Sequence, residues 1–222
     1  MKGIFCTREV SEGIDGKAHS VLSMLNSALS GCSVYCLDQV HSDRIVLAQD
    51  LSLGDIPEAD AIISRNPDDV LCVRTADCVP VLAWSEEARL IAAIHAGWRG
   101  LALQIVEKTI RAMKAMGGRD IHASIGPAIG RCCYEVKTDV IDALGVEPET
   151  DGEGSLFVDL PKVAASQLEK AGLKPHAIDM KALCTSCNKD RFFSFRRQGD
   201  KAGRNISAIG GKSWSLPGLQ VG

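Results

Sequence analysis

The stretch Ile91-Ala-Ala-Ile-His95-Ala-Gly-Trp-Arg-Gly100 decides the fold around it. Its apolar run is typical of a strand that is covered on both faces, and the run ends at a histidine. Glycines then allow a turn, and an amphipathic segment follows. The sequence therefore predicts an imidazole, a flexible backbone and an arginine at a strand-to-helix junction, where ligands tend to bind.

Short apolar runs on both sides of this stretch predict a series of strands. These are Val34–Leu37, Arg44–Ala48, Ala61–Ser64, Val70–Arg74, Val79–Trp84, Leu90–Ile94, Ile121–Ile125, His176–Met180, Phe192–Phe195 and Ile206–Ile209. Several of them are apolar throughout, as expected for strands buried on both faces.

Helical patterns are fewer. They cover Leu101–Met116, Asp159–Gly172 and Thr138–Leu144. In the first, Leu103, Val106, Ile110 and Met113 recur three or four residues apart, and Gly117-Gly118 is expected to end the helix. The second begins with an aspartate, a good N-cap residue. Many strands with few helices predict an α+β fold in which packed sheets carry outer helices.

Length and composition describe an ordinary globular protein. The chain has 222 residues, of which 45% are hydrophobic and 24% charged, with a net charge of −3. It is long enough to bury a sizeable core, and we expect one domain over residues 1–222. The breaker-rich segment Gly145–Gly154 is interpreted as a surface loop within that domain. The charge balance does not favour binding to nucleic acid or to a membrane surface.

The location expected from the sequence is the cytoplasm. The N-terminus lacks the apolar core of a signal peptide, and no apolar run approaches the roughly 20 residues of a transmembrane helix. The nine cysteines are an odd number, which argues against a complete disulfide framework. We therefore expect reduced thiols.

Three segments that end in metal-binding side chains suggest a metal site. They supply His41, Cys78 and His95, the donor types that zinc prefers. Three protein ligands leave a position for water or a substrate oxygen, which is the catalytic pattern. The spacing alone is weak evidence, because a single histidine is often a hydrogen-bonded structural residue and a single cysteine a small buried hydrophobe.

The other cysteines suggest less. Cys184-Thr-Ser-Cys187 has the spacing of a metal-binding knuckle, but no second compact pair completes a set of four ligands. The adjacent Cys132 and Cys133 are expected to fill the core or a loop.

Taken together, these segments closely resemble the laccase-domain (YfiH-type) family, long labelled polyphenol oxidases. The matching motifs are Gln39-Val-His41, Ala59-Asp-Ala61, Thr75-Ala-Asp-Cys-Val-Pro80, His95-Ala-Gly-Trp-Arg-Gly100, Ile125-Gly-Pro-Ala-Ile-Gly130, Cys133-Tyr-Glu-Val136, Cys184-Thr185, Phe192-Phe-Ser-Phe-Arg-Arg197 and Gly203-Arg204. They occur in family order from about residue 35 onward. The N-terminal region resembles the family less and looks shortened, since Glu12-Gly-Ile-Asp15 and Met24-Leu-Asn26 are only faint counterparts.

The resemblance implies an α/β/β/α sandwich of mixed sheets and a zinc ion held by His41, Cys78 and His95, with copper as the alternative metal. It implies phosphorolysis of adenosine, inosine, guanosine and methylthioadenosine, with adenosine deamination as a side activity. It also links some bacterial members to peptidoglycan-precursor quality control. The implied partners are purine nucleosides and phosphate, and the implied assembly is a monomer or a small homo-oligomer.

Phosphorolysis assigns candidate roles to individual residues. The turn from Gly97 to Gly100 offers backbone N–H groups to an anion, and the Arg99 guanidinium could grip phosphate in two places. Trp98 could stack on a base or simply pack. Arg44 and Arg74 lie near the segments that carry the candidate ligands and are weaker substrate-binding candidates. Asp77 could shuttle a proton next to the metal, or it could face away and orient backbone.

Two alternatives remain open at this stage. Cys78 could be a thiolate nucleophile of a metal-free hydrolase or amidase, with His95 or His41 as its base. The chain could also be a partner-binding module, for example in cell-wall assembly. A blue-copper oxidase is rejected on chemistry, because the chain has five histidines and no His-x-His pair. Signatures of cytidine deaminases, P-loops and serine hydrolases are also missing from the sequence.

Overall fold

Two mixed β-sheets dominate the computed structural model, which describes residues 2–5, 8, 15–29, 31–66 and 68–210. The smaller sheet has the spatial order β1 (Lys2–Phe5), β13 (Asn205–Gly210), β5 (Asp69–Thr75) and β2 (Ser33–Cys36). The larger has the order β12 (Ile178–Met180), β8 (His122–Ile125), β6 (Val79–Ser85), β7 (Leu90–Ala96), β4 (Ala61–Ser64) and β3 (Ile45–Leu47). Parallel pairs occur in both, as in β2 with β5 and β3 with β4, beside antiparallel ones.

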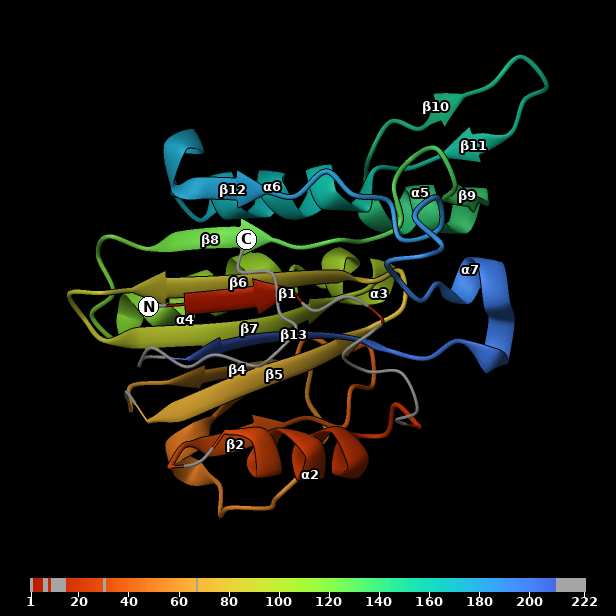
Figure 1. The fold of residues 1–222 in the computed structure, drawn as a ribbon. Coiled ribbons are helices and arrows are strands. Elements are labelled where there is room, and N and C mark those ends of the chain that lie inside the picture. Colours follow the sequence, from red (N-terminus) through yellow and green to blue (C-terminus); the bar gives the residue numbers. More distant parts are fainter. Residues whose placement is uncertain (1, 6–7, 9–14, 30, 67, 211–222) are drawn as a thin grey trace.

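Helices cover the outer faces of the two sheets, so the layers run α/β/β/α (Figure 1). Helix α2 (Ala18–Ala28) packs on the smaller sheet. Helices α4 (Ile105–Ala115) and α6 (Leu160–Lys170) pack on the larger one. Between the sheets lies a third apolar cluster, with Leu71 from β5 and Ile91 from β7. The predicted fold class is confirmed.

Strand β7 is the centre of the molecule. All seven of its residues are buried, because the smaller sheet and the helices cover its two faces. The strand pairs with β6 on one side and with β4 on the other. His95, near its end, is thus placed by a fully buried scaffold. Among the described residues, no helix is long and apolar enough to cross a membrane.

Shorter elements surround this frame. They are α3 (Trp98–Ala102), α5 (Thr138–Leu144), α7 (Phe195–Gln198), the 3₁₀ turns η1 (Ala48–Asp50), η2 (Pro175–Ala177) and η3 (Gly199–Lys201), and a small sheet of β10 (Glu149–Thr150), β11 (Leu156–Phe157) and β9 (Glu135–Val136). The β10–β11 hairpin projects from the body (Figure 1).

Several element predictions need correction. The predicted helix over Leu101–Met116 is two helices, because Gln104 adopts a left-handed conformation (φ 62°). That break changes the helical phase, and Leu103 is 46% exposed instead of facing the core. The predicted strand over Phe192–Phe195 is wrong: it is unpaired chain that leads into α7. His176–Met180 is a strand only from Ile178, and Glu149–Thr150 forms a strand inside the predicted loop.

In the N-terminal region two elements were not predicted, and some residues singled out in the sequence lie outside the described part of the chain. Helix α2 and strand β1 were missed, and Met24–Asn26 belongs to α2. Residues Glu12–Ile14 lie outside the described part of the chain. Two helix ends follow the sequence as predicted. Asp159 caps α6 by accepting a hydrogen bond from the Lys162 N–H (3.1 Å), and Gly117 (φ 98°) follows the end of α4.

Candidate active site

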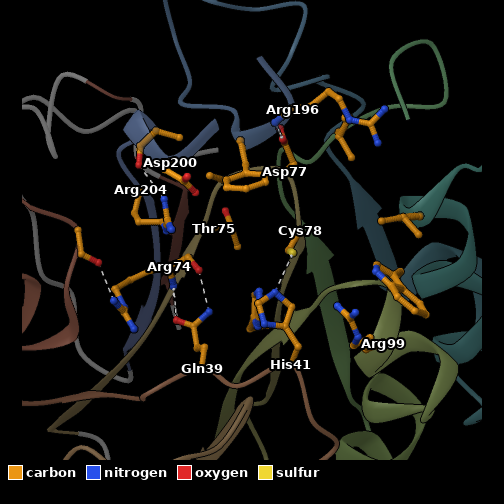
Figure 2. A pocket seen from close by; sticks show the side chains of 18 of the residues that line it. Gln39, His41, Arg74, Thr75, Asp77, Cys78, Arg99, Arg196, Asp200 and Arg204 are labelled. Carbon is orange, nitrogen blue, oxygen red and sulfur yellow. Dashed lines mark hydrogen bonds between the residues drawn. The ribbon is translucent and has the colours of Figure 1, made fainter. Parts of the chain in front are cut away.

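A cavity of about 690 Å³ opens where β5, β6 and β7 meet the loops at one end of the sheets (Figure 2). His41, Cys78 and His95 line it, together with side chains from the N-terminal segment and from the chain between Phe195 and Arg204. Residues more than a hundred positions apart therefore share one wall.

The three predicted metal ligands converge. The Cys78 Sγ atom lies 3.8 Å from the His41 Nε2 atom, and the two imidazole rings are 4.9 Å apart in an edge-to-face arrangement. One donor atom from each of the three side chains lies within 4.8 Å of the others. Ligands at about 2.0–2.3 Å from a zinc ion would have donor separations of this order. The donor set and its compactness fit a metal ion with one open position.

Asp60 forms hydrogen bonds with two of these residues. The sequence analysis assigned it no role. This fully buried carboxylate lies 2.7 Å from the His95 Nδ1 atom, and it accepts hydrogen bonds from the His41 and Ser42 N–H groups. It thereby leaves the other imidazole nitrogen of His95 free to face the metal position. The available signal was a lone acid between two alanines, directly before a buried strand.

Electrostatics favour the charged forms of Cys78 and His95. Burial opposes charge on the Cys78 thiol, but the charge of His95 and the hydrogen bonds of both histidines outweigh it and lower its pKa to about 6. Burial likewise opposes charge on His95, but the Cys78 thiolate and the Asp60 carboxylate raise its pKa to about 9. A thiolate is the form that binds a metal, and it is also the form that acts as a nucleophile.

Gly97 leaves space for the three candidate ligands His41, Cys78 and His95, which we call the trio. A Cβ atom at this position would lie 2.9 Å from His41 Cδ2 and 3.0 Å from Cys78 Sγ. The glycine of the His95-Ala-Gly-Trp motif is therefore needed so that both ligands can approach the backbone after β7. It precedes the first residue of α3 and does not itself line the cavity.

Asp77 adopts a left-handed backbone (φ 91°) and turns its side chain towards the wall of the site. Its two oxygens accept hydrogen bonds from Thr185 Oγ1 (2.6 Å), Ser194 Oγ (3.0 Å) and the Arg196 N–H (2.6 Å). Figure 2 shows it facing Arg196. Such contacts suit the orienting role of Asp77, the second of the two roles that the sequence suggested for it.

The other predicted residues fall into two groups. Arg99 and Trp98 line the cavity, and the Arg99 guanidinium lies 4.4 Å from the centre of the Trp98 ring. Arg44 is exposed and is not among the described residues that line the cavity; its backbone carbonyl instead accepts hydrogen bonds from Asp60 and Ala61.

The far wall of the cavity is built around Arg74, which the sequence offered only as a weaker anion-binding candidate. Arg74 donates to the carbonyls of Gly16 (2.6 Å) and Leu37 (2.9 Å), and the Gln39 amide clamps the Arg74 backbone through two hydrogen bonds. Burial lowers the pKa of Arg74. Figure 2 places Arg74, Arg204 and Gln39 together, on the opposite side of the trio from Arg99.

Tyr134 completes the wall near the trio. Burial, together with the negative charge of Cys78, raises its pKa to about 12, so its hydroxyl stays protonated at neutral pH. The Arg196 guanidinium lies 5.3 Å from its ring centre. The motif Cys133-Tyr-Glu-Val had been noted, but nothing in it indicated that the tyrosine faces the cavity.

The fold and the site belong to a known class. The family described as multi-copper polyphenol oxidoreductase laccase matches residues 13–212, so the chain belongs to this family. A protein of Bacteroides thetaiotaomicron named purine nucleoside phosphorylase is 37% identical over 68% of this chain and 60% of its own length. A protein of the same name from Clostridium acetobutylicum is 37% identical over 78% of this chain and 75% of its own length.

Solved structures agree. The crystal structure of YlmD from Geobacillus stearothermophilus superposes with a TM-score of 0.80 at 28% identity, over 92% of this chain and 85% of that one. The hypothetical protein YfiH of Bacillus licheniformis gives a TM-score of 0.79 at 31% identity, over 91% and 85% of the two chains.

Proposed function

We propose that this chain is a zinc-dependent purine nucleoside phosphorylase that works as one domain over residues 1–222. The observation that carries the proposal is the convergence of His41, Cys78 and His95 on one point of a cavity of nucleoside size. The names of the relatives supply the substrate class. We take the substrates to be adenosine, inosine, guanosine and methylthioadenosine, with adenosine deamination as a side activity.

In phosphorolysis a phosphate oxygen bonds to C1′ of the ribose while the C1′–N9 bond breaks and its electron pair leaves with the purine. A zinc ion held by His41, Cys78 and His95 would supply Lewis acidity at an oxygen. Arg99 binds and orients phosphate from the near rim, as a planar guanidinium suits two phosphate oxygens. Tyr134, which stays protonated, is placed to hold a proton towards the cavity.

The remaining residues position this machinery. Asp60 holds His95 and the His41 backbone, and Asp77 ties the segment with Thr185 and Arg196 to the end of β5. Copper at the same three ligands is the alternative metal, but a multicopper centre is not supported, because His19, His122 and His176 lie on α2, β8 and η2 and do not line the cavity. Multicopper chemistry needs many more imidazoles in one place.

The test compares Cys78→Ala with Cys32→Ala, a cysteine that packs beside α2 far from the cavity. Cys78→Ala is expected to lose phosphate-dependent release of hypoxanthine from inosine by about 100-fold or more, because loss of a ligand should exceed the 10- to 100-fold cost of losing a residue that only orients a ligand. Cys32→Ala is expected to retain the activity. Base release by wild-type protein that does not depend on phosphate would contradict the proposal.

One observation favours a second candidate, a metal-free cysteine hydrolase: the pKa of Cys78 near 6 beside an imidazole suits a nucleophile. The two functions differ in what occupies the thiolate. As-purified protein whose Cys78 reacts rapidly with iodoacetamide, with no metal bound, would favour the hydrolase. Protection of Cys78 from iodoacetamide that is lost when a chelator is added would support the phosphorylase.

A further inference from the structure

A second cluster of donor atoms lies outside the catalytic trio. Cys132 and Cys133 follow the glycine-rich chain after β8, and Cys184 and Cys187 follow β12. All four sulfur atoms lie within 4.8 Å of one another, and none of the four residues is in a disulfide. The expectation that no second pair completes the Cys184/Cys187 knuckle is therefore wrong, because the second pair is adjacent in sequence and lacks a recognisable spacing.

The sulfur separations suit a shared metal ion. Cys187 Sγ is 3.5 Å from Cys132 Sγ and 3.4 Å from Cys133 Sγ, far beyond a sulfur–sulfur bond of about 2.05 Å. Four thiolates at about 2.3 Å from one ion, at tetrahedral angles, lie about 3.8 Å apart. A cluster of several irons would spread its cysteines more widely than a single ion does, so the compactness favours a mononuclear site.

Backbone hydrogen bonds hold the segments around the cluster, and one of them is donated to a sulfur. The Gly130 N–H donates to Cys184 Sγ (3.2 Å), and the N–H groups of Cys133 and Tyr134 donate to the Gly130 carbonyl. Across the cluster, Asn188 donates to the Cys184 carbonyl through its N–H and its side-chain amide. A donor aimed at a sulfur stabilises thiolate over thiol, which is what a metal requires of its ligands.

We propose that Cys132, Cys133, Cys184 and Cys187 hold a structural zinc ion, separate from the ion proposed at Cys78. Four thiolates in a closed set are the donors of structural zinc, which needs no open position. Binding releases protons from those thiols that are not already ionised, and no sulfur is oxidised.

The position of the cluster indicates what the ion does. One of its segments continues to Tyr134 and the other to Thr185, both parts of the cavity wall or its support. Between these segments the described chain has a single isolated β-bridge, from Ala128 to Cys184. Zinc at the four cysteines would join them covalently and hold that wall in place.

Metal analysis of protein purified without chelator tests the proposal. Wild-type chain is expected to hold two zinc ions, and Cys78→Ser one, because only the trio is broken. Cys132→Ser/Cys187→Ser is expected to lose one ion relative to wild type, and Cys32→Ser none. A Cys78→Ser protein without zinc would overturn the proposal, as would iron in its place or a disulfide within the cluster. A single ion that survives in Cys78→Ser but is absent from the double variant would support this site even if the catalytic proposal fails.

If the Cys132→Ser/Cys187→Ser variant does not fold, a second measurement tests the proposal without it. Cobalt loaded into the full-length Cys78→Ser chain should give the intense thiolate charge-transfer absorption of a tetrahedral four-sulfur site. Alkylation of the same zinc-loaded chain should leave the four cysteines unmodified until a chelator is added, although Cys132 and Cys187 are exposed. Immediate alkylation of both residues, or a cobalt spectrum without that absorption, would overturn the proposal.

Discussion

At the scale of single residues, the site depends on groups that hold ligands more than on the ligands alone. Asp60 is buried, carries a negative charge and contacts four donors: the His95 ring, the N–H groups of His41 and Ser42, and the Ser42 hydroxyl. A buried charge is tolerated only where such partners offset its desolvation. This single carboxylate therefore couples the stability of the fold to the geometry of the metal position.

Asp60→Asn is expected to weaken zinc binding by about 10- to 100-fold, because the amide cannot accept from all four donors and His95 loses its negative partner. The free energy of unfolding should fall by about 1–3 kcal/mol. Chelator competition and urea unfolding measure the two effects. Asp43→Asn, at an exposed ion pair with Lys108, is the control. Unchanged zinc affinity in Asp60→Asn would show that the His95 contact is dispensable.

Gly97→Ala places a methyl group against His41 and Cys78. The backbone there has φ −73°, which alanine adopts freely, so the expected damage comes from the contacts alone. Zinc affinity and turnover should fall at least 10-fold, and overpacking should cost about 1–3 kcal/mol of stability. Gly152→Ala is the matched control, since nothing lies within 4 Å of a Cβ there. Equal zinc content and turnover in the two variants would refute the spatial role of Gly97.

The pKa of Cys78 gives a pH dependence in metal-free protein. Because its thiolate forms with a pKa near 6 instead of 9, alkylation by iodoacetamide should rise between pH 5 and 7 and then level off. As the pH falls through 6, Cys78 becomes protonated and the reactive thiolate form is lost. His41→Ala should move the midpoint upward by removing a hydrogen bond to the sulfur. A midpoint near 9 in wild-type protein would contradict the ion-pair arrangement.

At the scale of elements, a helix end was predictable where a local sequence rule determines it. It was not predictable where tertiary packing determines it. The cap of α6 follows from Asp159 alone. The break at Gln104 does not, since apolar residues continue across it at helical spacing and glutamine is a good helix former. The break separates α3, which contacts α5, from α4, which contacts β4, and such tertiary contacts are not visible in local periodicity. The same holds for Phe192 and Phe193, which are buried without pairing as a strand.

Asp159→Ala should lower the free energy of unfolding by about 0.5–2 kcal/mol, because the Lys162 N–H loses its acceptor at the start of α6. Asp159→Asn keeps an acceptor and should retain most of that stability. Urea denaturation of the three proteins measures the effect. A loss as large in Asp159→Asn as in Asp159→Ala would indicate that charge, through the Lys162 ion pair, matters more than the cap.

At the scale of the whole molecule, two sheets and two covering layers bring distant segments to one cavity. The sequence indicated the class of fold and the three candidate metal ligands, because motifs whose side chains can bind a metal lie at predicted strand ends. It did not indicate Asp60, Tyr134 or Arg204 as partners of that site, and it offered Arg74 only as a weaker candidate. The Arg74 guanidinium, for example, donates to carbonyls 58 and 37 positions away, and single-sequence patterns describe only local periodicity. The convergence of Cys132 and Cys133 on Cys187 was missed for the same reason.

The most direct test of the central claim is phosphorolysis of inosine followed while zinc is removed from the full-length protein and added back. The account predicts that hypoxanthine release requires phosphate, falls with removal of the ion bound at Cys78, and returns as that site is refilled. Chelation should also reduce thermal stability, because a bound ion stabilises the folded state. Turnover that persists after both ions are gone, or that proceeds equally without phosphate, would contradict it.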